Sequence, residues 1–588
     1  MRVIYPYGLN ETEATNESEV HAGYNFELQF GAKKLSPRGP IDLKGTAPNG
    51  GSINGIMQLV TRANSVTTLI YADASTPTLY NWTGANTSTA FTSVRTTSSD
   101  SMLRAAYWSL TDCLTITDLR KLTPLLNWNG TACTRQKTGL GVGSTTVITS
   151  ISEASGTYTV LEAGHGLVAG DLAIIAGTTN AGHNAEHEVT NVVSAGAWDY
   201  VDAVGYGAST DGTAEKGVEL FAKYSVVHNG RLWLFNITTD TDENAHMILA
   251  SAFEDYESFD TVTRSGAATG NEAFYTLSPD LKSINGVTSF NRQLLISTED
   301  GAIHRLIGVD AADYQFATYY SGSAAIGEES MANIGNDVIY MRNSGNIDLL
   351  GAKVESSDVG ADDISRFIPT TIHDLTESLT VYDQAHQKVF FFVGDKILVL
   401  FKDILATSQG SPWSVYKTAL TDSSGSIFDT KAATYIRRPS ETVYTIYFGD
   451  VDGNIYDLNG TGYGDNSTSI ALSVTKPLIE STRLKILRGY IQYRRFGQFN
   501  CSVIFDWSEE YNQTICDLTL KGSTTTEEPP YYGAEVYYGG DFYYNEGFEF
   551  ADTVSKQNFS PAGRSDGFFM TFYADTTVQW QVDHIELT

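Results

Sequence analysis

Two groups of residues have the types that could hold a metal ion. Asp450, Asp452 and Asn454 alternate along the chain like the first ligands of a calcium-binding loop, since carboxylate and amide oxygens suit that ion. A complete loop of this kind also needs glycine at its sixth position and glutamate at its twelfth, where Ile455 and Thr461 stand. The segment therefore predicts a hairpin turn on its Asp-Gly pair and no calcium site.

Three histidines, His165, His183 and His187, form the second group. No spacing typical of zinc ligands on a helix relates them, so we expect His165 to cap a turn and the other two to lie on the surface. The four cysteines show no Cys-x-x-Cys spacing and are expected to stay reduced. They are Cys113, Cys133, Cys501 and Cys516.

Catalytic motifs are weak in this chain. Ser297-x-Glu299-Asp300-Gly301 resembles the Asp-box of sialidases, but the aromatic residue of that box is absent. The sequence contains no Gly-x-Ser-x-Gly, His-Glu-x-x-His or phosphate-binding loop, and the glycines at 139, 141 and 143 lack a strand and a helix around them. We predict that the protein is not an enzyme, with no catalytic, cofactor-binding or metal-binding residues and no cofactor.

The composition of the chain limits the classes of protein to which it could belong. The 588 residues carry 69 Asp and Glu against 38 Lys and Arg, a net charge of −31, which excludes a protein that grips nucleic acid or anionic membranes. The chain contains 41% hydrophobic and 12% aromatic residues, enough for large cores. It has no apolar run of 18 residues and no apolar segment at its start, so we expect neither a membrane-spanning helix nor a signal peptide.

One unit recurs along the chain: an apolar strand, a turn often built on Asp or Asn with Gly, and a second strand. Its copies are roughly 45–60 residues apart, a spacing typical of propeller blades, whose small sheets bury their faces by stacking in a ring. The alternative is a set of ordinary hairpins in β-sandwiches. The copies span residues 67–84, 226–235, 290–306, 336–350, 386–400 and 444–458.

We predict an all-β protein: a β-propeller with an inserted small β-domain and a C-terminal β-sandwich-like domain. Residues 1–144 form an N-terminal segment with the first blade or blades, 145–217 the insert, 218–465 the remaining blades and 466–588 the C-terminal domain. Between the C-terminal strands, Tyr531 to Asn545 is rich in Tyr and Gly, which suits a contact surface as well as a solvated loop.

Three motifs resemble proteins of short-tailed bacteriophages. Lys34 to Pro40 contains Pro-Arg-Gly, and Gly50 to Ile56 reads Gly-Gly-Ser-Ile-Asn-Gly-Ile, which resembles the opening of their tail proteins. His165-Gly166-Leu167-x-x-Gly170-Asp171 resembles a small β-module of phage tails, and Gly563 to Phe568 is similar to their closing domain. The family indicated is the podovirus tail nozzle, or tail tubular protein B. This chain is shorter than the larger members.

The resemblance implies a structural virion protein. Its expected partners are further copies of itself, a portal–adaptor ring, and tail fibres or spikes. Such subunits assemble in the host cytoplasm into a ring, which is expected to be a hexamer. The ring extends the channel through which double-stranded DNA leaves the particle, and its contact with the DNA is transient and non-specific. Acidic stretches such as Asp358 to Asp363 and Glu527-Glu528 could line that channel and repel DNA, or only keep the protein soluble. The alternatives are a propeller glycosidase or depolymerase and a receptor-binding tail protein.

Overall fold

In the computed structural model nearly all regular elements are β-strands, with 61% of residues in strands and 5% in helices, which confirms the predicted all-β class. It describes residues 2–3, 10–11, 20, 22–27, 36–85, 87–239, 243–260, 272–308, 310–322, 325–327, 329–342, 345–353, 358–372, 378–393, 396–405, 411–418, 430–438, 442–458, 465, 470–476, 479–486, 489–494, 499–507, 513–520, 554–559, 563–576 and 581–587. Tyr531 to Asn545 and Glu527-Glu528 lie outside these residues. The helical segments within them are η1 (Ser88–Ala90), η2 (Ala181–His183), η3 (Pro279–Leu281), η4 (Ser365–Phe367), α1 (Pro369–Ile372) and α2 (Lys402–Leu405).

Seven antiparallel four-stranded sheets form the middle of the molecule, and six of them use strands consecutive in the sequence. Sheet 1 is β6 (Ser52–Val60), β7 (Val66–Asp73), β8 (Thr78–Trp82) and β9 (Phe91–Thr96). Sheet 2 is β10 (Leu103–Trp108), β11 (Cys113–Asp118), β12 (Leu126–Trp128) and β13 (Cys133–Arg135). Sheet 3 is β21 (Leu220–His228), β22 (Arg231–Thr239), β23 (Glu243–Ala250) and β24 (Phe274–Leu277).

The next three sheets repeat this order. Sheet 4 is β25 (Ile284–Phe290), β26 (Gln293–Thr298), β27 (Ala302–Ile307) and β28 (Gln315–Ser321). Sheet 5 is β29 (Met331–Asn333), β30 (Val338–Met341), β31 (Ile347–Lys353) and β32 (Asp358–Asp363). Sheet 6 is β33 (Leu379–Asp383), β34 (Lys388–Val393), β35 (Lys396–Phe401) and β36 (Trp413–Tyr416).

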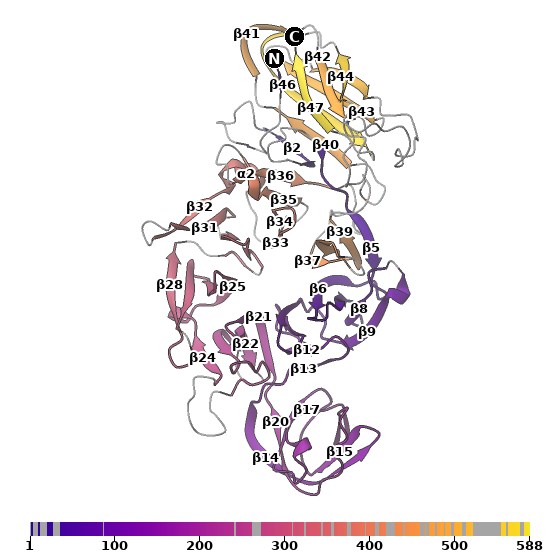
Figure 1. Ribbon diagram of the computed structural model, residues 1–588, viewed down its shortest axis with the longest axis vertical. Helices are drawn as coiled ribbons and strands as arrows, with labels where there is room; N and C mark the ends of the chain where they lie inside the picture. Colours follow the sequence, from indigo (N-terminus) through magenta and orange to yellow (C-terminus); the bar gives the residue numbers. More distant parts are fainter. Residues whose placement is uncertain are drawn as a thin grey trace, which may run out of the picture.

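Sheet 7 joins the two ends of the sequence. It consists of β37 (Ala432–Arg437), β38 (Tyr444–Gly449) and β39 (Asn454–Asp457), and its fourth strand is the N-terminal β5 (Asp42–Thr46). Along the series each first strand packs against the next, from β6 through β10, β21, β25, β29 and β33 to β37, and β37 packs against β6. Figure 1 shows the seven sheets in this sequence.

All six predicted strand–turn–strand units are antiparallel hairpins, which confirms that part of the sequence reading. The turns use residues that tolerate a positive φ, for example Asn229 and Gly230 at 49° and 69° between β21 and β22. The hairpin of sheet 2 was not predicted. Its strands β12 and β13 have three residues each, which is too few for alternation to stand out.

The insert is one seven-stranded path between sheets 2 and 3, running from Gly141 to Gly217 where the sequence suggested 145–217. Its core residues all lie between Ile148 and Ala214 and are separate from the cores of the seven sheets. The strands are β14 (Gly141–Ala154), β15 (Thr157–Glu162), β16 (Leu172–Ala176), β17 (Glu186–Glu188), β18 (Asn191–Ser194), β19 (Ala197–Val201) and β20 (Thr213–Gly217).

The C-terminal unit is two sheets that share one apolar core, and N-terminal strands that the sequence did not assign to it take part in both. One sheet is β1 (Arg2–Val3), β47 (Gln581–Leu587), β42 (Gly489–Arg494) and β45 (Val554–Phe559). The other is β2 (Ala22–Tyr24), β40 (Ile470–Thr475), β46 (Gly563–Thr576), β43 (Phe499–Trp507) and β44 (Gln513–Leu520), with β41 (Ile479–Ile486) on β46. A separate ribbon pairs β3 (Phe26–Glu27) with β4 (Ser36–Pro37).

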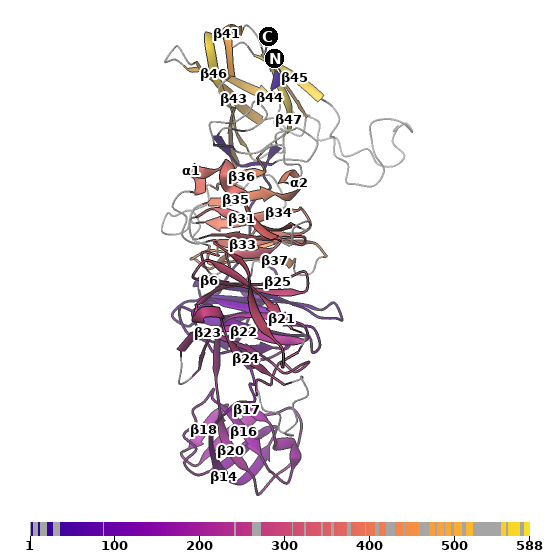
Figure 2. The ribbon, with the colours of Figure 1, turned by 90° about the vertical axis from the view of Figure 1, so that its left-hand side faces the viewer.

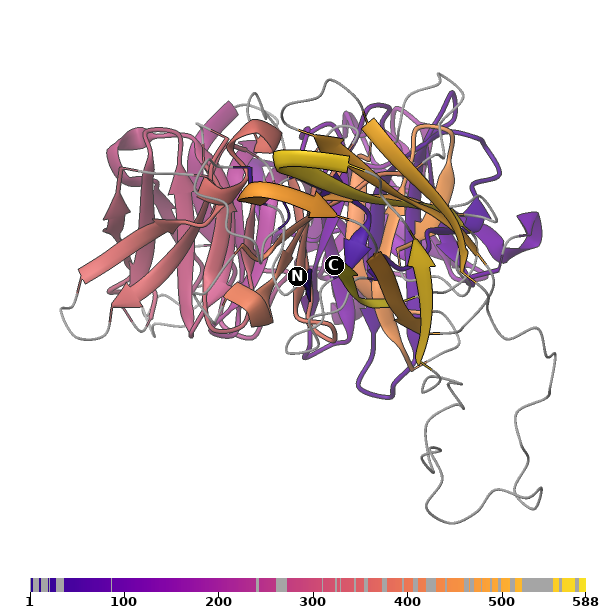
Figure 3. The ribbon, with the colours of Figure 1, turned by 90° about the horizontal axis from the view of Figure 1, so that it is seen from above.

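The three parts lie along one axis. Figures 1 and 2 show the C-terminal unit at one end, the seven sheets in the middle and the insert at the other end. The pairing of β1 with β47 brings the chain ends together, and Figure 3 shows both ends in the C-terminal unit. No helix in the described ranges is long and apolar enough to cross a membrane.

Candidate functional site

The hairpin turn predicted at Asp452-Gly453 is confirmed, because β38 pairs with β39 directly across it. The carboxylate of Asp450 holds this turn. Its Oδ1 accepts the backbone N–H groups of Asp452 at 2.9 Å and Asn454 at 2.8 Å, and its Oδ2 accepts the side-chain amide of Asn454 at 2.9 Å and the hydroxyl of Tyr456 at 3.1 Å. The residues that resembled a calcium loop therefore bind their own backbone.

The histidines of the insert differ from the prediction in one respect. His165 caps its turn as expected, since its Nδ1 accepts the N–H of Leu167 at 3.0 Å. His183 and His187 are buried and not on the surface, because the aromatic core of the insert surrounds them. His183 accepts the hydroxyl of Tyr200 at 2.6 Å, and His187 stacks on the Tyr200 ring with centroids 4.0 Å apart. Burial lowers the pKa of His187 to about 4.

The segment that resembled an Asp-box forms the turn between β26 and β27. Ser297 is fully buried and its Oγ accepts the N–H of Ala325 at 2.8 Å, while Thr298 donates to the carboxylate of Asp300 at 2.7 Å. The glycine-rich segment at 139–143 is the entry into the insert. Among the described residues, no cluster of His, Cys, Asp and Glu is arranged to hold a metal ion.

A cavity of about 400 Å³ lies where the first strands of the sheets meet. Sheets 1, 2, 3 and 7 contribute most of its wall, and the side chains are a mixture of polar and apolar types. Tyr107 lies at this wall and donates its hydroxyl to Asp112 at 2.6 Å. Partial burial and the Asp112 charge raise the pKa of Tyr107 to about 12, so its hydroxyl stays protonated near neutral pH.

Arg104 and Glu329 form an ion pair at this cavity. Nε of Arg104 donates to Oε1 of Glu329, and Nη2 donates to Oε2 at 2.5 Å. The other three donors of the guanidinium reach carbonyl oxygens: Nη1 reaches Asn54 at 2.9 Å and Leu103 at 2.8 Å, and Nη2 reaches Lys431 at 2.9 Å. All five donors of Arg104 are therefore used.

The Arg104–Glu329 pair connects sheets that are far apart in sequence. Asn54 is in sheet 1, Arg104 in sheet 2, Glu329 precedes sheet 5 and Lys431 precedes sheet 7. The carbonyl of Glu329 also accepts the N–H of Thr380 in sheet 6 at 2.9 Å, and Glu329 has a φ of 62°, which is unusual for a residue other than glycine. We call this pair the central pin.

The Pro-Arg-Gly motif forms a second arginine node. The guanidinium of Arg38 is fully buried and binds both carboxylate oxygens of Asp465, with Nη1 to Oδ1 at 2.7 Å. Its remaining donors bind Asn25 Oδ1 at 2.9 Å, the carbonyl of Gly39 at 2.8 Å and the carbonyl of Lys417 at 2.8 Å. Arg38 thus joins the N-terminal segment, the end of sheet 6 and the start of the C-terminal unit.

The Gly-Gly-Ser-Ile-Asn-Gly-Ile motif is explained by close packing. A Cβ on Gly51 would lie 2.2 Å from the carbonyl oxygen of Asp73, and a Cβ on Gly55 would lie 2.9 Å from that of Leu103 in sheet 2. Only glycine fits such approaches without moving the backbone. The two N-terminal motifs of the family resemblance therefore hold neighbouring parts of the chain together.

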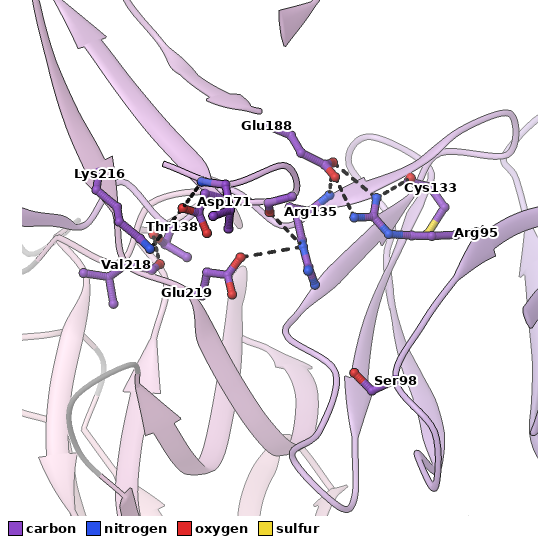
Figure 4. A network of polar contacts seen from close by, with 12 residues as sticks. Arg95, Ser98, Cys133, Arg135, Thr138, Asp171, Glu188, Lys216, Val218 and Glu219 are labelled. Carbon is purple, nitrogen blue, oxygen red and sulfur yellow. Dashed lines mark hydrogen bonds and ion pairs between the residues drawn. The ribbon is translucent and has the colours of Figure 1, made fainter. Parts of the chain in front are cut away.

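The junction between the insert and the seven sheets is polar (Figure 4). Glu188 of β17 binds Arg95 of β9 through both oxygens, at 2.5 and 3.2 Å, and accepts the N–H of Arg135 at 2.8 Å. Nε of Arg135 donates to the carbonyl of Gly170 at 3.1 Å, and Glu219 lies 3.7 Å away. Burial raises the pKa of the Cys133 thiol beside this network to about 12, so it stays protonated.

The two linkers of the insert are held by Glu186, which lies two residues before Glu188 on the same strand. Its Oε2 accepts the N–H groups of Thr138 and Gly139, both at 2.8 Å, and the N–H of Val218 donates to the carbonyl of Leu140 at 2.8 Å. Burial raises the pKa of Glu186. No local pattern in the sequence indicates these pairs, because their partners are 47 to 93 residues apart.

The acidic stretch at 358–363 forms β32, the outermost strand of sheet 5. The carboxylate of Asp363 accepts the side-chain amide of Asn346 at 2.7 Å and the N–H and hydroxyl of Ser365 at 2.9 and 2.6 Å. This strand is three strands away from β29, the first strand of the sheet, and Asp363 is not among the residues that line the cavity. Asp363 therefore belongs to the outer edge of the sheet and not to the cavity wall.

No protein-family model matches this chain, and no curated protein matches it. Three solved structures are similar in part. The computationally designed Ika8 protein matches with a TM-score of 0.31 and 9% identity over 71% of this chain and 99% of that chain. Saccharomyces cerevisiae Sqt1 matches with 0.35 and 9% over 71% and 98%, and Chaetomium thermophilum Raptor with 0.33 and 8% over 74% and 28%. TM-scores this low do not establish a common fold.

Proposed function

We propose that the seven sheets form a β-propeller and that the chain is a structural subunit of a short-tailed phage tail, in the manner of a tail nozzle. The propeller is supported by the order in which the first strands pack, with β37 against β6, and by β5, which completes sheet 7 from the other end of the chain. A ring of this kind buries the faces of sheets that are too small to be stable alone.

The observation that carries the proposed function is the Arg38 node. Arg38 belongs to the Pro-Arg-Gly motif of the resemblance, and its buried pair with Asp465 ties the propeller to the C-terminal unit. A buried arginine with every donor used positions chain segments and leaves none of its donors for a ligand. The Pro-Arg-Gly motif thus holds two parts of the chain rigidly together, as a subunit of a channel wall requires.

The proposed channel lies between copies and not through one propeller. The cavity of about 400 Å³ is of the size that holds a small molecule, and the central pin occupies its wall. A DNA duplex, whose major groove alone is about 12 Å wide, cannot thread it. Copies therefore surround the duplex, and head-to-tail contacts that close into a ring provide the assembly.

The net charge of −31 suits this role. A wall that neutralised phosphates would hold DNA more tightly with every contact, whereas an acidic wall repels it over roughly 8–10 Å at physiological salt. In the proposed ring, sheet 5 faces the axis, and the acidic strand β32 at its outer edge lines the channel. Fibres or spikes and the portal–adaptor ring take the surfaces that remain.

Reconstruction of tails from particles that carry this protein tests the proposal. We expect several copies around one axis, in the virion, between the adaptor ring and the tail tip. Absence of the chain from virions contradicts the proposal. Release of reducing sugar from host polysaccharide by the purified protein supports the alternative, a glycosidase or depolymerase.

A further inference from the structure

The insert has the features of a separate module on a short connection. Two adjacent linkers, at 138–140 and 218–219, connect it to the propeller, and they are joined by the bond from Val218 N–H to the Leu140 carbonyl. Gly139 in the first linker has a φ of 69°, and a Cβ there would find its nearest neighbour only at 3.7 Å. Gly139 thus places in the first linker the residue type with the widest choice of backbone angles, in a left-handed conformation that other residues rarely adopt.

The described contacts between the body of the insert and the propeller are charged and polar, whereas the linker residues Leu140 and Val218 pack against the core of sheets 2 and 3. The apolar core of the insert draws no residue from the propeller, and the adjoining cores of sheets 1, 2 and 3 draw none from residues 148–214. Glu186 and Glu188 of the strand β17 join the two bodies, together with the carbonyl of Gly170, which accepts Nε of Arg135. Polar interfaces between parts of one chain permit relative motion far more readily than apolar ones do.

The two glutamates of β17 have different roles. Glu186 binds Thr138 and Gly139 of the linker, so it travels with the hinge. Glu188 binds Arg95 and the N–H of Arg135 on the propeller, so its bonds break if the insert turns away. The side chains of Arg95 and Glu188 are 18% and 20% exposed, which leaves an edge of the pair open to water and to competing ions.

We propose that the insert is a hinged arm, that its hinge is the pair of linkers held by Glu186, and that Glu188 with Arg95 and Arg135 is the latch that fixes the arm on the propeller. Opening the latch leaves both bodies folded and changes only their relative orientation. This inference does not depend on the proposed virion role, because it concerns the isolated chain.

Distances between two labels test the latch in the full chain. Spin labels at Ser152 in the insert and Thr92 on β9, both exposed, are attached through unnatural ketone residues so that the native cysteines remain. We expect a single narrow distance distribution for the parent protein. Glu188→Gln and Arg95→Gln should each broaden it or add a second population, because either change removes the paired charges.

The control is Glu299→Gln, the same chemical change at an exposed residue in the turn between β26 and β27 of sheet 4, which should leave the distribution unchanged. Limited proteolysis with mass spectrometry of the fragments shows whether the insert, residues 141–217, stays folded in each variant. Arg95 lies outside the insert, so Arg95→Gln tests the latch even if Glu188→Gln unfolds the insert. A narrow distribution identical to that of the parent in folded Glu188→Gln and Arg95→Gln overturns the proposal.

Discussion

Replacing Arg104 with methionine tests whether the central pin holds the seven sheets together. Methionine keeps most of the side-chain length but removes all five donors. The carboxylate of Glu329 then loses its two charged hydrogen bonds, and the carbonyls of Asn54 and Lys431 lose one each. Sheets 1, 5 and 7 lose a common contact in this single change.

The expected cost follows from the burial of the pair. Breaking a fully buried ion pair by removing one partner costs about 3–5 kcal/mol. Arg104 and Glu329 are 18% and 23% exposed, so water solvates part of the orphaned carboxylate, and we expect about 2–4 kcal/mol. At about 2–4 °C per kcal/mol for a large domain, the melting temperature falls by roughly 4–16 °C.

Differential scanning calorimetry on the full chain measures this loss. The matched control is Arg62→Met, the same substitution at an exposed arginine. It should change the free energy of unfolding by less than about 0.5 kcal/mol. The double variant Arg104→Met/Glu329→Leu should recover part of the loss, since it removes the stranded charge. If Arg104→Met melts at the temperature of the control, the pin does not hold the sheets and the reasoning fails.

Three further predictions concern the Arg38 node, the insert and the glycine motif. Arg38→Lys supplies three donors where five are used and should destabilise the protein by about 3–5 kcal/mol, measured by chemical denaturation; an unchanged midpoint would contradict the node. Because burial lowers the pKa of His187 from its unfolded value near 6.5 to about 4, the stability it contributes is complete above pH 6.5 and is lost as the pH falls toward 4, by about 3 kcal/mol. Glu186, whose pKa burial raises, acts in the opposite direction, so comparing acid unfolding of the parent with His187→Gln isolates the histidine, and equal acid sensitivity of the two would refute its role. Gly51→Ala should cost about 1–3 kcal/mol through its 2.2 Å approach to a carbonyl, whereas Gly196→Ala, with open space around it, should cost far less in thermal melts.

The hairpins were predictable because their signal is local. An apolar strand, an Asp-Gly or Asn-Gly turn and a second strand lie within about 15 residues, and turn chemistry decides the pairing. The turn at Asp452-Gly453 formed for this reason. Sheet 2 gave a weaker signal, since β12 and β13 are three residues long and the chain between β11 and β12 has no alternation.

The arginine nodes and the place of the N-terminal strands were not predictable from one sequence. Arg104 and Glu329 are 225 residues apart, and Arg38 and Asp465 are 427 apart, so nothing local relates them. His183 and His187 were wrongly predicted to lie on the surface, because their surroundings, above all Tyr200, come from another strand. Polar residue type predicts exposure only until a distant aromatic core supplies partners.

The most direct test of the central claim is a cryo-electron microscopy reconstruction of tails that contain this chain, with DNA retained. We predict density for the duplex on the common axis between several copies, and a closed centre in each seven-sheet ring with Arg104 against Glu329. A copy that stands alone, or duplex density running through the centre of one seven-sheet ring, would contradict the account.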